Sequence, residues 1–243
     1  MWNVLRFYTM ESAAAKRGHI KAWLVHIYTA GGAVLAFIGA WAVVHGYDRA
    51  AFGAMAAATV IDSTDGALAR RFDVKHVLPE IDGARIDDIV DYITFVFLPM
   101  LLLEASGGLY WWGLPVIAVV LLSSMYGFIA PDAKTADAFF TGFPSYWNVV
   151  VLYLLVFRVP PGWNALILLA LSSLIFVRIG YVYPSRTPVL RTLTLTLSAI
   201  WGVMIVIMIV QLPSPPRTVA IASLGFPVYY TVLSLWLNAR RAR

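Results

Sequence analysis

Long apolar runs separated by short polar segments make up most of this chain. A run of about 20 apolar residues is long enough to cross the hydrocarbon core of a bilayer as a helix. The runs predict an all-α, polytopic integral membrane protein with eight spans and with both termini on one side. We place the spans at residues 22–45, 49–70, 85–104, 110–130, 144–158, 162–183, 188–210 and 217–237, of which 144–158 is the shortest.

Residues 1–21 precede the first apolar run and follow a different pattern. They mix aromatic and apolar side chains with Arg6, Lys16, Arg17 and Lys21. Basic amphipathic segments lie on anionic membrane surfaces, so we expect a short interfacial helix here; a disordered tail is the alternative. The pattern divides the chain into this N-terminal helix and one transmembrane domain, residues 22–243.

Composition supports the membrane interpretation. Of the 243 residues, 60% are hydrophobic and 13% are charged, and the mean hydropathy is +0.78. A soluble domain carries about 25% charged residues. The chain has no cysteine, which excludes disulfides and thiolate chemistry. Its first residues do not show the pattern of a removable signal peptide.

The distribution of basic residues predicts which side of the membrane each loop faces. Cytoplasmic loops carry an excess of Lys and Arg. With the N-terminus in the cytoplasm, all of the 18 Lys and Arg except Arg49, Arg158 and Arg217 fall on the cytoplasmic side. This asymmetry supports eight spans, and it attributes the net charge of +5 to anionic headgroups rather than to nucleic acid.

Four aspartates stand where two apolar runs meet their cytoplasmic loop. Asp62 and Asp65 are three residues apart, and Asp87 and Asp91 are four apart. Because successive helical residues rotate by about 100°, each pair lies on one helix face. Acids at the mouth of membrane helices are costly and usually functional, and carboxylates are ligands of hard divalent cations. The pattern predicts a metal site; solvated helix ends are the alternative.

Small residues and one arginine accompany the two pairs. Gly66 and Ala69 follow the first pair, and Gly83 precedes the second, so a ligand could approach the backbone closely. Arg70 lies five residues after Asp65, where its guanidinium suits a phosphate held by a metal.

Two facing carboxylate pairs can hold two metal ions. Such ions polarise a phosphoryl group and stabilise the attacking and leaving oxygens. Asp91 lies one turn deeper than Asp87, and it could take the proton of an attacking alcohol as a general base. The residues therefore favour phosphoryl transfer at the inner membrane surface.

The motif resembles the signature of the CDP-alcohol phosphotransferase superfamily: Asp-x2-Asp-Gly-x2-Ala-Arg, a spacer, and Gly-x3-Asp-x3-Asp. Every fixed position is present, as Asp62, Asp65, Gly66, Ala69, Arg70, Gly83, Asp87 and Asp91. The spacer, residues 71–82, has twelve residues. It is longer than in most of the superfamily and is similar to that of the bacterial phosphatidylcholine synthase branch. Residues 26–32 and 134–148 resemble the same branch.

The resemblance implies a reaction. CDP-diacylglycerol would bind with its nucleotide at the cytoplasmic mouth and its acyl chains in the bilayer. The hydroxyl of choline would attack the phosphorus that carries diacylglycerol, giving phosphatidylcholine and CMP. The resemblance also implies Mn²⁺ or Mg²⁺ as two divalent ions, a homodimer, and the bacterial inner membrane with the active site on the cytoplasmic side.

The resemblance assigns roles to the motif residues. The implied metal ligands are Asp62, Asp65, Asp87 and Asp91, of which the last would also act as the catalytic base. The residues implied to line the CDP site are Gly66, Ala69, Arg70 and Gly83.

The choline pocket is less defined by the sequence. Aromatic rings bind quaternary ammonium groups. The aromatic residues expected near the cytoplasmic side are Tyr92, Tyr126, Phe140, Tyr146, Trp147, Tyr181 and Tyr183. For each of them an interfacial aromatic belt is the alternative. His26 and Thr29 could face the nucleotide or pack in the core, and Lys134 could meet a phosphate or lie on the surface.

Three other functions stay open. The same reaction could use serine, inositol or glycerol phosphate as the acceptor, although a phosphorylated alcohol would favour more basic residues near the site. A cation-translocating transporter would need polar residues across the bilayer, whereas the acids stop at the inner mouth and Glu104 stands alone near the other end. A non-catalytic lipid-binding protein is the third.

Overall fold

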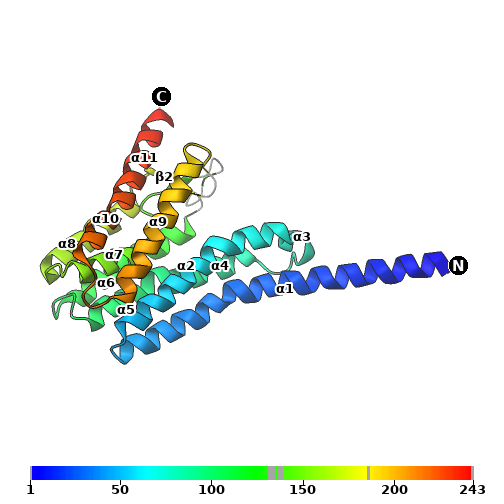
Figure 1. Cartoon of the computed structure of the whole chain (residues 1–243), viewed down its shortest axis with the longest axis horizontal. Helices are drawn as coiled ribbons and strands as arrows, with labels where there is room; N and C mark the ends of the chain where they lie inside the picture. The colour runs from blue at the N-terminus through cyan, green and yellow to red at the C-terminus, as the bar shows by residue number, and fades with distance from the viewer. Residues whose placement is uncertain (1, 131–134, 136–138, 185–186, 242–243) are drawn as a thin grey trace.

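The computed structural model describes residues 2–130, 135, 139–184 and 187–241, and most of these are helical (Figure 1). The larger helices are α1 (Trp2–Val44), α2 (Asp48–Arg71), α6 (Gly113–Ile129), α8 (Pro161–Ile175), α9 (Arg191–Val210) and α11 (Gly225–Arg241). The shorter elements are α3 (Val74–Val77), α4 (Gly83–Asp91), η1 (Tyr92–Phe97), α5 (Leu98–Ala105), β1 (Phe139–Thr141), α7 (Trp147–Val156), β2 (Gly180–Val182) and α10 (Arg217–Ser223).

Helices α1 and α2 form an antiparallel hairpin along one side of the molecule. Helix α1 ends at Val44 because Gly46 adopts a left-handed conformation, with φ of 71°, which turns the chain back. The N-terminal part of α1 extends beyond the other helices (Figure 1). The helix is continuous through residue 21, so the boundary expected there is not a break in the backbone.

Helices α4 and α5 are joined through the π-helical segment η1 into one rod, from Gly83 to Ala105. This rod matches the apolar run expected at 85–104, and α2 matches the run at 49–70. The π-helical turns begin directly after Asp91. A π-helical turn holds more residues than an α-helical turn and is frequent at functional sites.

The hydrophobic core lies between the rod and helices α2, α6, α7 and α8. It contains Leu98, Leu102 and Leu103 from the rod and the fully buried Trp147 from α7. The Trp147 indole nitrogen donates a hydrogen bond to Ser124 Oγ on α6 at 2.8 Å. The core therefore holds the N-terminal end of α7 firmly against the rod and α6.

The single helix expected at 162–183 is wrong beyond Ile175. Helix α8 ends there, and residues 180–182 form strand β2, which pairs antiparallel with β1. Phe139 is opposite Val182 and Phe140 is opposite Tyr181. Residues 176–183 are rich in β-branched and aromatic side chains and contain Gly180, a composition that favours a strand over a helix.

Three helices of the described chain are long and apolar enough to cross a membrane: Ala15–Val44, Arg191–Val210 and Arg217–Arg240. Helices α6, α7 and α8 are apolar but shorter. Helix α7 has 10 residues and at 1.5 Å per residue spans about half of a hydrocarbon core of about 30 Å. The structure is that of a helical membrane protein, and the number of eight spans stays a prediction.

Candidate metal centre

Three of the four predicted aspartates meet between α2 and α4. Asp62 comes from the C-terminal half of α2, and Asp87 and Asp91 come from successive turns of α4. One carboxylate oxygen of each lies within 4.8 Å of the other two. Two helices that are separated in sequence by the α3 loop therefore present their acids to one point.

Electrostatics and geometry both suit a divalent cation at this point. Two ionised carboxylates 4.8 Å apart repel each other by about 3 kcal/mol at an effective dielectric constant of about 20. A cation among them reverses the sign of this contribution. Oxygens on opposite sides of one Mg²⁺ lie about 4 Å apart, so the observed spacing requires only small side-chain adjustments. The donor set fits a hard divalent metal, and Asp62, Asp87 and Asp91 are the residues that would hold it.

Asp65 is the fourth predicted ligand, and it lies outside this group of three. Its side chain is buried, with 6% exposed, and its Oδ2 accepts a hydrogen bond from Thr29 Oγ1 at 2.9 Å. Next to it, Tyr28 and Thr64 are hydrogen-bonded at 2.8 Å. Helix α1 therefore fixes the orientation of α2 at the turn that carries Asp62 and Asp65.

The room at Gly83 is taken by a side chain of the protein. A Cβ at Gly83 would lie 2.9 Å from Cε1 and 3.3 Å from Nδ1 of His26. The imidazole is buried, with 6% exposed, and within the described chain its Nε2 has no hydrogen-bond partner. Gly83 thus lets α4 begin directly against His26 of α1, next to the Thr29–Asp65 contact.

Gly66, Ala69 and Arg70 occupy the last turns of α2. A Cβ at Gly66 would lie 3.3 Å from Nη1 of Arg70, so the exposed guanidinium lies back over Gly66 and near the turn of Asp62. Ala69 packs against the apolar cluster that α1 forms with Val74 and Leu78. The motif therefore combines one cationic side chain near the acids with one small packing residue.

The sequence did not single out Tyr146, which comes immediately before α7. It lies near Tyr230 and Tyr183, and it interacts electrostatically with Asp62 and Asp91. The Tyr230 hydroxyl in turn donates to the carbonyl oxygen of Val182 at 2.9 Å. The sequence placed Tyr146 among the aromatic residues expected near the cytoplasmic side, but nothing in it distinguished Tyr146 from the other members of that set.

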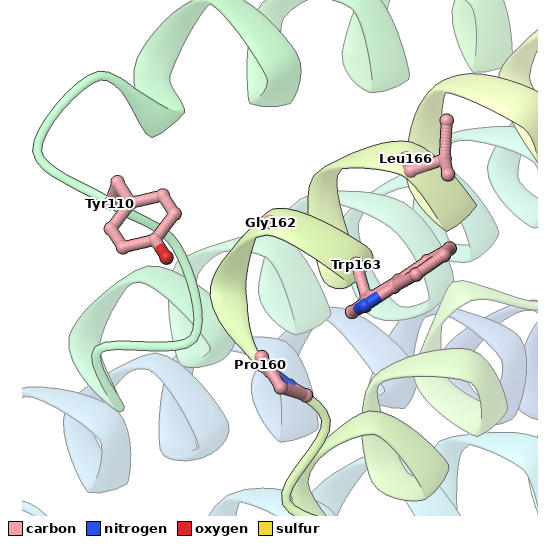
Figure 2. Close-up of a pocket in the computed structure, with 5 residues that line it drawn as sticks. All are labelled: Tyr110, Pro160, Gly162, Trp163 and Leu166. Carbon is pink, nitrogen blue, oxygen red and sulfur yellow. The ribbon is translucent and has the colours of Figure 1, made fainter.

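A pocket of about 400 Å³ lies elsewhere, at the far end of the rod from Asp91. Figure 2 shows Tyr110, from the loop after α5, facing the first turns of α8, where Trp163 and Leu166 complete the wall. Asp91 precedes the end of the rod at Ala105 by 14 residues, which is about 20 Å of helix. This pocket is therefore separate from the carboxylate cluster. Lys134, the predicted phosphate contact, lies outside the described residues.

Comparison with known proteins finds relatives that are named phosphatidylcholine synthase. The chain is 36% identical to that of Legionella pneumophila over 226 residues, which cover 90% of this chain and 89% of the relative. It is 32% identical to that of Pseudomonas aeruginosa over 221 residues, or 90% of this chain and 93% of the relative. The Rhizobium meliloti protein is 33% identical over 214 residues, covering 86% and 88%. No family model matches the chain.

Proposed function

The chain belongs to the phosphatidylcholine synthase family, and on that basis we propose that it transfers the phosphatidyl group of CDP-diacylglycerol to the hydroxyl of choline. The products are phosphatidylcholine and CMP. The observation that carries the proposal is the convergence of Asp62, Asp87 and Asp91 within 4.8 Å, in a chain that is similar to its relatives over most of its length.

In the proposed site, Asp62, Asp87 and Asp91 hold divalent metal, with Mn²⁺ or Mg²⁺ as the ion and two ions expected. Asp65, fixed by Thr29 one turn from Asp62, completes the ligand set. Bound metal would neutralise charge on the diphosphate and stabilise the attacking and leaving oxygens. Arg70, whose guanidinium lies over Gly66, contacts the diphosphate from the side of α2.

The reaction needs one proton acceptor. The choline oxygen forms a bond to the phosphorus that carries diacylglycerol, the bond from that phosphorus to the CMP oxygen breaks, and the hydroxyl proton moves to a carboxylate of Asp91. Asp91 suits this role because it is the deepest acid of the cluster along α4, next to the π-helical turns of η1. Gly66 and Gly83 allow the Arg70 guanidinium and the His26 ring to lie close over the backbone, and in the proposed site these two positions border the nucleotide.

The proposed arrangement in the membrane follows the distribution of charge. Eight spans with both termini in the cytoplasm place the cluster at the inner surface of the bacterial inner membrane, where CDP-diacylglycerol can keep its acyl chains in the lipid. A homodimer is the expected assembly. The three long apolar helices support the membrane location.

The test is to incubate the purified protein with CDP-diacylglycerol, choline and Mn²⁺ and to analyse the lipids and the released CMP. Phosphatidylcholine formed in equal amount to CMP supports the proposal. If serine, inositol or glycerol phosphate suppresses product formation and choline does not, the acceptor is wrong. Ion flux in reconstituted vesicles without release of CMP would instead identify a transporter.

A further inference from the structure

We propose that Tyr146 and Tyr183 form the binding site for the quaternary ammonium of the acceptor alcohol, next to Asp91. The proposal rests on the proposed function, since it names the site that selects the acceptor in that reaction. It concerns a part of the chain outside the acidic motif, formed by the residue before α7 and the residue after β2.

The N-terminal end of α7 lies beside the turn of α2 that precedes Asp62. Asn148, two residues after Tyr146, donates a hydrogen bond from its side chain to Thr59 Oγ1 of α2 at 3.4 Å. Thr59 lies one turn before Asp62 on α2. The N-terminal end of α7 is therefore packed against the turn of α2 that leads into the carboxylate cluster. Consistent with this placement, Tyr146 interacts electrostatically with both Asp62 and Asp91.

The backbone at Tyr146 is held in place by its neighbours in sequence. Tyr146 stands between Ser145 and Trp147, which are buried, with exposed fractions of 4% and 0%. Ser145 adopts a positive φ of 55°, which turns the chain at this point. Tyr146 as a whole residue is 39% exposed. Its backbone is thus fixed by buried neighbours while its ring remains accessible to a ligand.

Hydrogen bonds from α11 hold the strand β2 next to Tyr146. The hydroxyl of Tyr230, a neighbour of Tyr146, donates to the Val182 carbonyl at 2.9 Å. Strand β2 is fixed on α11 by Ser234 and Asn238, which accept from Val182 N at 3.1 Å and from Gly180 N at 3.0 Å. The Tyr230 proton is thus used within the protein, and Tyr230 is held against β2 beside Tyr146. In the proposed site, Tyr146 offers a ligand the face of its ring.

Tyr183 supplies the second aromatic ring of the proposed site. Tyr183 follows β2 directly, lies near Tyr146, and stacks on Phe140 of β1 with 4.6 Å between ring centroids. The β1–β2 sheet, which replaces the end of the helix expected at 162–183, therefore places Tyr183 near Tyr146.

Chemistry selects the ligand class. A trimethylammonium group has no N–H to donate and binds to ring faces, and only an ethylene group separates its nitrogen from the reacting oxygen of choline. An oxygen placed at Asp91 therefore requires the cation to lie within a few Å of Asp91, on the side of the cluster that interacts with Tyr146. A primary ammonium would instead require acceptors for its N–H groups, which the rings do not provide.

The experiment compares Tyr146→Leu with the wild-type protein, using choline and its uncharged isostere 3,3-dimethylbutan-1-ol as acceptors. The matched control is Tyr110→Leu, an aromatic residue with 47% exposure at the far end of the rod. We expect Tyr146→Leu to raise the KM for choline about ten-fold, the effect of losing a partly desolvated cation–π contact. The preference for choline over the isostere should fall by a similar factor, and the KM for CDP-diacylglycerol should stay within about two-fold.

An unchanged preference in Tyr146→Leu overturns the inference and leaves the proposed function intact. If the wild-type protein forms no product from choline but does from another alcohol, the proposed function fails and the inference fails with it. Should Tyr146→Leu not fold, the comparison moves to Tyr146→Phe against a trifluorinated phenylalanine at position 146, which keeps the ring but weakens its negative face. A higher choline KM for the fluorinated ring supports the inference, and equal values for both rings overturn it.

Discussion

The two ends of the Gly83–Ala105 rod offer a ligand different things. Near its start, three carboxylates lie within 4.8 Å of one another, with a guanidinium on the last turn of α2. Beyond its other end, the Tyr110–Trp163 pocket is an open surface hollow of about 400 Å³ (Figure 2). The first has charge placed for phosphoryl transfer, and the second has volume without carboxylates among its lining residues. We infer that charge identifies the active end and that volume alone does not.

The support around the two ends differs as well. At the acidic end, helix α1 contributes Thr29 to Asp65 and His26 to the space over Gly83. At the other end, Asn164 of α8 donates to the Gly108 carbonyl at 2.7 Å, which connects α8 to the loop after α5 and stabilises the fold there. Substitutions at the two ends should therefore affect turnover and stability in different proportions, and the four changes below test this in order of expected effect.

The largest effect is expected from Asp91→Asn. The amide keeps an oxygen for metal but cannot accept the proton of the attacking hydroxyl, so kcat should fall by about 10³-fold, within the range for loss of a general base. Binding of CDP-diacylglycerol should change little. Initial rates of CMP release and equilibrium binding of the CDP-lipid measure the two quantities. Full activity in Asp91→Asn would remove this residue from the mechanism.

A smaller loss is expected from Thr29→Val, which keeps the shape of the side chain and removes the hydrogen bond to Asp65. Residues that orient a metal ligand typically contribute 10–100-fold in metal affinity or activity, so the Mn²⁺ concentration for half-maximal rate should rise about ten-fold. The rate at saturating Mn²⁺ should recover most of the wild-type value. An unchanged Mn²⁺ dependence would show that Thr29 does not act through Asp65.

Gly83→Ala should reduce activity several-fold and also reduce stability. The new Cβ would lie 2.9 Å from the buried His26 ring, and overpacking of this kind costs about 1–3 kcal/mol. The matched control is Gly53→Ala, where a Cβ meets nothing within 4 Å and the substitution within a helix should be neutral or slightly stabilising. Thermal unfolding in detergent and CMP release compare the two. Equal stability of the two variants would contradict the packing of His26 on Gly83.

The smallest effect is expected from Trp163→Leu at the far pocket. Trp163 is 61% exposed and lies on α8, away from the carboxylates. The KM for choline and the KM for CDP-diacylglycerol should each stay within about two-fold of wild type, because the substitution changes no group near the reacting atoms. A large rise in either KM would indicate that a substrate binds at this pocket, and it would contradict the assignment of the active site to the acidic end of the rod.

The sequence predicted the helices that are defined by long local patterns. The run at 49–70 and the run at 85–104 each appear as helices that extend by one or two residues at their ends, as α2 and the Gly83–Ala105 rod. The run at 162–183 appears as a helix only up to Ile175, because the apolar, β-branched stretch that follows fits either a buried helix or a strand. The deciding factor is pairing with Phe139–Thr141, almost 40 residues earlier along the chain, and local periodicity does not contain it.

The same limit applies to the site. Helical spacing was sufficient to bring Asp87 and Asp91 to one face of α4, and their meeting with Asp62 follows from the packing of α4 against the helical hairpin. The contact of Thr29 with Asp65 and the position of Tyr146 depend on tertiary packing between segments far apart in sequence. Neither of these two features could be predicted from the sequence alone.

The central claim is that the carboxylates of α2 and α4 jointly bind a divalent cation. Its most direct test is the electron paramagnetic resonance signal of free Mn²⁺, measured after adding limiting Mn²⁺ and CMP to the purified protein. Asp87→Ala is compared with Asp88→Ala, its neighbour outside the group of three. The account predicts that the wild-type protein and Asp88→Ala deplete the free-ion signal and that Asp87→Ala leaves most of it. Equal depletion by both variants would contradict the account.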